Sequence, residues 1–144
     1  ESQGTAVNVA CYLGHSPLRV YVMGEDAMSR EAREDEIDQM KTLLREAIEV
    51  GAVGLATSES PNHVGYEGRS VPSRLANFGE IHALAKVLGE MGQGIIQISA
   101  GGEIRFDHYT ALAEATGNNV NWSSLLREKL TLICTMNIWQ RQMS

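Results

Sequence analysis

Residues 34–57 read EDEIDQMKTLLREAIEVGAVGLAT and join a helical pattern to a short apolar run. Apolar residues recur at helical spacing up to Val50, opposite a charged face, and Gly51 stands where a helix C-cap belongs. The apolar run Ala52–Thr57 begins directly afterwards and has the length of a buried strand. The order helix, glycine, strand is what the return of a βα unit requires.

The same alternation extends in both directions along the chain. Before this stretch, the apolar run Ala6–Leu13 predicts a strand that stops at the Gly14–Pro17 segment. After it, Asn77 has the character of an N-cap with Glu80 as its capping-box partner, which predicts a helix ending near Gly92. The remaining expected elements are strands at Gly94–Ser99 and Asn119–Trp122, a short helix over Asp107–Thr116, and a helix beginning after Ser123 or Ser124.

Four strands alternating with helices predict the α/β class. The strands are continuously apolar, which favours a parallel sheet covered by helices. A complete (β/α)8 barrel needs about 250 residues, whereas this chain of 144 supplies about half. We therefore expect one domain over residues 1–144, built as a partial (half) TIM-like barrel of about four βα units, with an open sheet as the alternative arrangement.

Composition narrows the class of protein. Hydrophobic residues make up 43% and charged residues 21%, which is typical of a globular domain. The formal charge of −6 argues against nucleic acid as a partner. The sequence has neither an apolar run of the roughly 18 residues that a membrane helix requires nor a signal peptide at its start. We expect a cytoplasmic protein without a membrane partner.

Ligands in parallel α/β proteins meet the loops that follow the strands, so polar residues there are candidates for a site. His15 follows the first strand. Its interpretations are a general base, a metal ligand, or simply a hydrogen-bonded histidine at a strand end. Ser58 follows the second strand, where its hydroxyl could hold a substrate carboxylate or bond its own backbone. His82 and His108 fall on helices and are expected at the surface.

The segment Ser58–Arg74 is long for a connection inside a compact domain and is therefore a candidate functional loop. It carries His63, Tyr66, Arg69 and Arg74, hydrogen-bonding groups that suit an anionic or amide ligand.

Several short motifs recur in an order that resembles a known family. They are Asn8-Val9-Ala10, Gly14-His15-Ser16, Leu18-Arg19, Val22-Met23-Gly24, Leu44-Arg45-Glu46-Ala47, Gly51-Ala52-Val53-Gly54-Leu55 with Thr57-Ser58, and Val71-Pro72-Ser73-Arg74. From about Asn8 to Leu126 the chain resembles the N-acyl-D-amino-acid deacylase (D-aminoacylase) branch of the metal-dependent amidohydrolase superfamily.

The resemblance implies a TIM-like barrel that binds one or two zinc ions and hydrolyses the amide of an N-acylated D-amino acid with metal-bound water. The sequence contains no counterpart of the family's His-x-His pair. Where the resemblance implies further ligand histidines, the chain has Gln97, Ser99, Ser123 and Ser124, which are poor zinc ligands. No metal ligand or catalytic residue is therefore carried over.

By the same resemblance, His15, Ser58, His63 and Arg74 match family positions and are expected to bind substrate. One hypothesis is a hydrolase of carbon–nitrogen bonds other than peptide bonds, incomplete as an isolated chain, with zinc if the family's chemistry is retained. The alternative is a non-catalytic half-barrel that forms a homo-oligomer, first of all a dimer, or binds a small anionic or N-acyl amino acid ligand.

Overall fold

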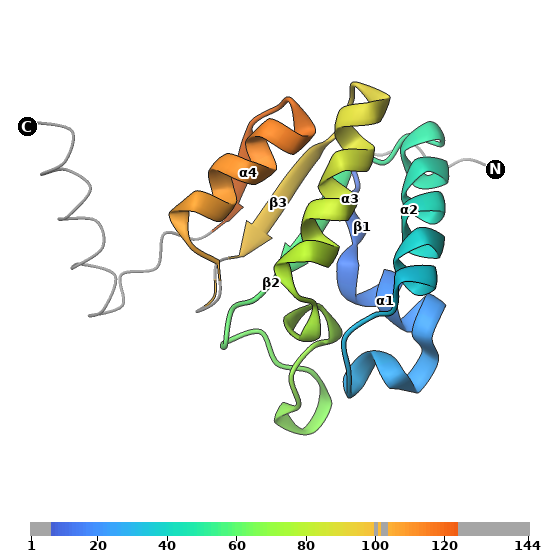
Figure 1. The fold of residues 1–144 in the computed structure, drawn as a ribbon, viewed down its shortest axis with the longest axis vertical. Coiled ribbons are helices and arrows are strands. Elements are labelled where there is room, and N and C mark those ends of the chain that lie inside the picture. The colour runs from blue at the N-terminus through green and yellow to red at the C-terminus, as the bar shows by residue number, and fades with distance from the viewer. Residues whose placement is uncertain (1–6, 100, 102–103, 124–144) are drawn as a thin grey trace, which may run out of the picture.

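The structure, a computed structural model, describes residues 7–99, 101 and 104–123 (Figure 1). Its strands are β1 (Leu13–Gly14), β2 (Gly54–Ser58), β3 (Ile95–Ser99) and β4 (Val120–Ser123). Its α-helices are α1 (His15–Met23), α2 (Glu34–Glu49), α3 (Phe78–Met91) and α4 (Phe106–Thr116). Short 3-10 turns are η1 (Gly24–Met28), η2 (Tyr66–Gly68) and η3 (Pro72–Leu75).

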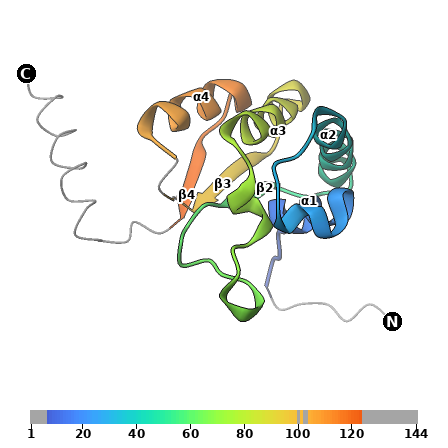
Figure 2. The same ribbon diagram turned by 60° about the horizontal axis from the view of Figure 1, so that its bottom comes forward.

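The four strands form one sheet in the order β1-β2-β3-β4, and all neighbouring strands are parallel. The helices lie side by side on one face of this sheet (Figures 1 and 2). Sequential parallel strands with helices on one face are the arrangement of part of a (β/α) barrel. The predicted α/β class and partial barrel are confirmed.

The core lies between the helices and the sheet. Leu44 of α2, Leu84 and Leu88 of α3, and Ile96 and Ile98 of β3 have no exposed surface. Burying each of these side chains contributes about 1.5–3 kcal/mol relative to exposure. This packing fixes the positions of the helices, and hence of the connections that precede them.

Three of the predicted helix ends are confirmed in detail. Asn77 caps α3, because its side-chain oxygen accepts a hydrogen bond from the Glu80 amide at 2.9 Å. Gly92 and Gly117 end α3 and α4 in the left-handed conformation, with φ of 64° at both.

The N-terminal region differs from the prediction. Helix α1 begins directly at His15, inside the Gly14–Pro17 segment where only the end of a strand was expected. Proline is tolerated here because the first turn of a helix needs no amide donor. Strand β1 is only two residues long, and before it Val7 and Val9 are exposed. Within the described residues β1 is an edge strand, so the residues before it can form strand hydrogen bonds on one side only. On that side, the Val53 amide donates a hydrogen bond to the Cys11 carbonyl oxygen.

The face of the sheet opposite the helices carries polar side chains toward the carboxyl ends of β2 and β3. Leu55 and Thr57 face the helices, so alternation along the strand directs Ala56 and Ser58 to the other face. In register with them lie Gln97 and Ser99 of β3. Of the positions where histidines were sought, Gln97 and Ser99 therefore lie on this second face.

The helix expected after Ser123 or Ser124 lies outside the described residues. In the part of the chain that the structure describes, no helix has the length and apolar character needed to cross a membrane.

Candidate functional site

A pocket of about 450 Å³ lies where the connections after three strands meet. Ser29–Glu31, from the connection after β1, form one side. Glu59 and Arg74–Phe78 come from the connection after β2, whereas Ile104 and His108 follow β3. This is the carboxyl end of a parallel sheet, where ligands of α/β proteins bind, and the volume is within the usual range of ligand pockets.

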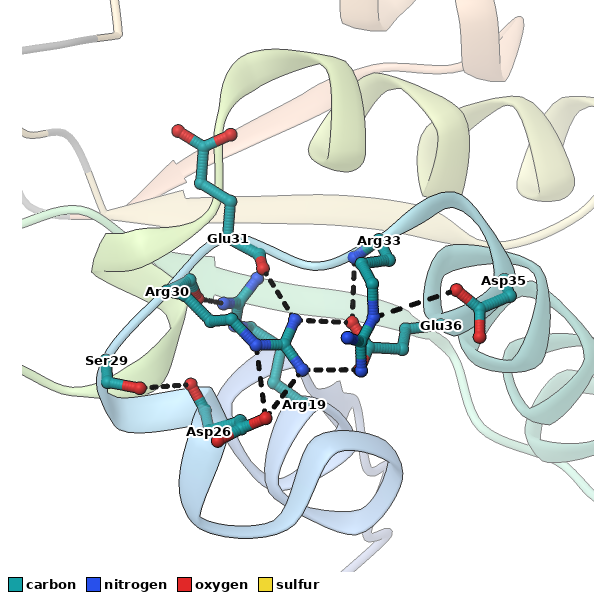
Figure 3. Close-up of polar contacts among 8 residues, drawn as sticks. All are labelled: Arg19, Asp26, Ser29, Arg30, Glu31, Arg33, Asp35 and Glu36. Atoms are coloured by element: carbon teal, nitrogen blue, oxygen red, sulfur yellow. Dashed lines mark hydrogen bonds and ion pairs between the residues drawn. The ribbon is translucent and has the colours of Figure 1, made fainter.

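Arg30 lines the pocket, but its guanidinium is fully engaged by other protein groups (Figure 3). It donates to Asp26 Oδ2 at 2.8 Å and to the Glu36 oxygens at 2.7 and 2.8 Å. Hydrogen bonds from Arg30 and from the Arg33 backbone lower the pKa of Glu36 to about 2. The bond to Glu36, followed by that to Asp26, raises the pKa of Arg30 above its ordinary value. Arg30 is therefore held as a structural cation.

Unlike Arg30, Arg74 has no carboxylate partner among the residues that the structure describes. Its Nη1 donates to Ser70 Oγ at 3.1 Å, and among the described residues no carboxylate lies within ion-pair distance of it. The side chain is half-buried at the edge of the pocket. Most of its donors are thus available to an anionic ligand.

His108 is the second donor in the pocket. Its ring stacks on Phe78 with centroids 4.0 Å apart and an angle of 13° between planes, which fixes both rings. Its Nδ1 accepts a hydrogen bond from the Arg105 amide at 3.3 Å. Because a neutral imidazole carries its proton on the other nitrogen, this bond leaves Nε2–H as a donor.

A buried charged cluster holds α1 and α3 to β2. His15, Arg19 and Glu80 are at most 1% exposed. His15 Nδ1 lies 2.8 Å from Thr57 Oγ1, and its Nε2 lies 2.8 Å from Glu80 Oε1. A carboxylate oxygen can only accept, so Nε2 carries a proton and donates it to this bond. The other Glu80 oxygen accepts from Arg19 Nη1.

The charge of Glu80 is set by competing effects. Burial alone would raise the pKa of Glu80, but hydrogen bonds and charges from His15 and Arg19 outweigh it and lower that pKa. Glu80 is therefore ionised at neutral pH. Arg19 also donates to the Arg30 carbonyl oxygen at 2.7 Å, which connects the buried cluster to the pocket.

A chain of serine hydrogen bonds joins the loops beside the cluster. The Ser73 amide donates to Ser16 Oγ at 3.0 Å, and Ser73 Oγ donates to the Ser58 carbonyl oxygen at 2.8 Å. Ser73 is 1% exposed. It fixes the backbone next to Arg74 relative to α1 and β2.

The four predicted substrate-binding residues take different positions, and their binding roles remain predictions. Arg74 lines the pocket. His15 is buried with both ring nitrogens bonded, and Ser58 is buried at the end of β2, joined to Arg74's loop through Ser73. His63 is exposed on the long connection, and no described contact joins its side chain to the other three.

No sequence motif marked Arg19, Thr57, Glu80 or Ser73 as functional, and His108 was expected at the surface. Glu80 had one local signal in the sequence: it stands three residues after the N-cap Asn77, the position of a capping-box partner. Its side chain, however, bonds to α1 rather than to the helix start. The tertiary contact could not be read from local spacing.

The zinc site that the resemblance implies would need several His, Cys, Asp or Glu side chains close together. Across residues 7–99, 101 and 104–123, no group of three His, Cys, Asp or Glu side chains is placed to hold a metal ion. The described residues therefore do not form the zinc site that the resemblance implies.

Comparisons with known proteins bear on the family. The chain is 46% identical to a D-aminoacylase of Alcaligenes xylosoxydans xylosoxydans over 52 residues, 36% of this chain. It is 33% identical to an N-acyl-D-glutamate deacylase of the same organism over 92 residues, 64% of this chain. An uncharacterized protein of Mycobacterium tuberculosis is 33% identical over 93 residues, 60% of this chain.

The matched segments span only 10%, 17% and 15% of these three relatives. No family model matches the chain, and no solved structure matches it. Within the segments that the matches cover, the resemblance to the N-acyl-D-amino-acid deacylases is confirmed.

Proposed function

We propose, from the similarity to a segment of the N-acyl-D-amino-acid deacylases, that this chain serves the hydrolysis of N-acylated amino acids. The bond cleaved would be a carbon–nitrogen bond other than a peptide bond. Two relatives are named D-aminoacylase and N-acyl-D-glutamate deacylase, and these names support the proposal. The chain's own contribution is to bind and orient the substrate at the carboxyl end of its sheet.

The observation that carries this proposal is the guanidinium of Arg74 in the pocket between three βα connections. An N-acyl amino acid is an anion at neutral pH because its amine is blocked and its carboxyl group is ionised. A guanidinium binds such a carboxylate through two parallel hydrogen bonds. Holding the carboxylate fixes the neighbouring amide, which is the group to be cleaved.

The other predicted binding residues have supporting roles in this proposal. His15 acts through Glu80 and Thr57, keeping α1, α3 and β2 in place around the pocket. Ser58 positions the loop of Arg74 through Ser73. His63 is proposed to contact the substrate from the exposed loop.

The zinc that the resemblance implies would supply an activated water for the hydrolysis. Since the described residues do not form a zinc site, no step proposed for this chain passes through a metal.

The proposal is tested by incubating the chain with N-acetyl-D-leucine or N-acetyl-L-leucine, with and without added zinc, and quantifying released leucine. We expect release above the blank, faster from the D form, and a loss of at least about tenfold in Arg74→Ala. Arg69→Ala is the control. Arg69 belongs to the same connection and was one of its candidate ligand-binding groups, but it is exposed, pairs with Glu67 at 3.3 Å and is not among the residues that line the pocket. Release no faster than the blank under every condition would overturn the hydrolase proposal.

A second candidate is the non-catalytic half-barrel that forms a dimer. It is favoured by one observation: among the described residues, β1 and β4 are the edges of a four-stranded parallel sheet. Exposed strand edges readily pair with another chain, and four strands are half of the eight in a closed barrel. Sedimentation equilibrium should then give twice the monomer mass of 15.7 kDa; a monomer at high micromolar concentration would exclude this candidate.

A further inference from the structure

The connection between β2 and α3 contains a hairpin, residues Val64–Ser70. Its base is an antiparallel bridge between Val64 and Ser70, and the Gly65 amide donates to the Arg69 carbonyl oxygen at 2.7 Å. At its tip, the Arg69 amide donates to the Tyr66 carbonyl oxygen at 3.2 Å. This green segment extends away from the sheet and the helices (Figures 1 and 2). The hairpin is therefore ordered by its own hydrogen bonds.

The hairpin is exposed, whereas the chain on both sides of it is buried. Glu59 before it, and Val71 and Ser73 after it, are at most 8% exposed. Between these anchors the residues 61–69 are exposed, apart from the half-buried Gly65. Segments with few buried contacts move at little cost in free energy. The hairpin can therefore move as one unit about its two junctions without disturbing the core.

Arg74 connects the pocket to the hairpin. Its Nη1 donates to Ser70 Oγ at 3.1 Å, and Ser70 is one side of the bridge at the base of the hairpin. Arg74 also lines the pocket, where most of its donors are available to an anionic ligand. A ligand that binds Arg74 is therefore placed beside the base of the hairpin.

The tip of the hairpin exposes apolar side chains. Tyr66 is 85% exposed and Val64 is 50% exposed. An aromatic side chain on an ordered loop favours binding, because little conformational entropy is lost when it is buried. Next to Tyr66, Glu67 has φ of 55°, a conformation that residues with a Cβ rarely adopt and that is found at ligand clamps and switch segments.

We propose that the hairpin is a lid, which closes over the pocket when a ligand binds Arg74, and that Tyr66 contacts the ligand in the closed state. The lid rests on the proposed function, because that function makes the pocket the ligand site, but it concerns binding and is measured without turnover. Closure removes water from around Arg74, which strengthens its bonds to a carboxylate. It also carries the exposed His63 toward the pocket, where the substrate contact proposed for this residue can form.

The test combines isothermal titration with hydrogen–deuterium exchange, and N-acetyl-D-leucine is the probe. We expect Tyr66→Ala to weaken binding by at least about fivefold, because a contact made only in the closed state is lost. Tyr21→Ala is the matched control and should bind as the parent chain does; Tyr21 is 79% exposed on α1 and is not among the residues that line the pocket. Saturating probe should slow exchange at Gly65–Arg69 but not at the exposed Val50 after α2.

Circular dichroism confirms that both tyrosine variants are folded. Equal affinity of Tyr66→Ala and the parent chain, unchanged exchange of the hairpin at saturating probe, or no detectable binding would rule out the lid. Slowed exchange together with weaker binding of Tyr66→Ala supports the lid even without leucine release, and that result would count against the hydrolase proposal alone. Leucine release with an unaffected hairpin would count against the lid alone.

Discussion

Glu80 accepts hydrogen bonds from two side chains of one helix, Arg19 and His15, at a place where none of the three is more than 1% exposed. A buried carboxylate of this kind is costly to desolvate, and it is kept because its partners supply compensating charge and hydrogen bonds. The free energy of folding therefore depends on the presence of all three side chains, Glu80, Arg19 and His15.

Glu80→Gln is expected to destabilise the chain by about 3–5 kcal/mol, because Arg19 then remains buried without its counter-charge. Urea unfolding at pH 7 measures the difference. Glu90→Gln, on the same helix, is the control; Glu90 pairs with Arg45 at the surface, and such pairs contribute about 0–1 kcal/mol. Equal losses in the two variants would show that the buried cluster has no special role.

The lowered pKa of Glu80 predicts that the stability of the chain depends on pH. The folded pKa of Glu80 lies below its ordinary value of 4.5, so the folded state favours the ionised form. Its stabilising contribution is fully present above the ordinary pKa and is lost as pH falls from there through the folded pKa. Unfolding curves between pH 7 and pH 3 should therefore show a steeper acid loss in the parent chain than in Glu80→Gln. Parallel pH profiles would contradict the assignment.

At the scale of elements, the pairing of β2 with β3 depends on one glycine. Gly54 has φ of 150°, and a Cβ there would lie 1.8 Å from the Ile95 carbonyl oxygen. Since this oxygen belongs to the backbone of the neighbouring strand, the two strands would have to separate.

Gly54→Ala is accordingly expected to prevent a stable fold, whereas Gly92→Ala should cost only about 1–2 kcal/mol. Gly92 also has a positive φ, of 64°, but a Cβ there meets nothing within 4 Å, so only the left-handed conformation is penalised. Thermal unfolding of both variants by circular dichroism compares them. A cooperative transition for Gly54→Ala near that of Gly92→Ala would contradict the close approach of the strands.

Elements were predictable from sequence where local signals agreed. Helix α2 and the glycine ends of α3 and α4 follow from apolar spacing and from the conformational freedom of glycine. Helix α1 was missed because Pro17 is a helix breaker everywhere except in a first turn, and the position of the first turn is not visible in the sequence.

For the whole molecule, the sequence was sufficient to predict a parallel α/β sheet but not the pocket. The sheet follows from repeated apolar runs, whereas the pocket brings together residues as distant as Arg30, Arg74 and His108. Arg30 and Arg74 have the same side chain, so the sequence does not distinguish them. In the folded chain, carboxylates occupy the donors of Arg30, whereas Arg74 keeps donors available to a ligand.

The ligand site proposed for this chain is the pocket between the three βα connections. The most direct measurement is a ¹H–¹⁵N NMR titration with N-acetyl-D-phenylalanine, with backbone amides assigned. Saturable shift changes are expected at Glu31, Arg74, Phe78 and His108, which come from all three connections. Shift changes confined to other surfaces, such as the hollow lined by Thr110, Glu114 and Asn118, or none at millimolar ligand, would contradict it.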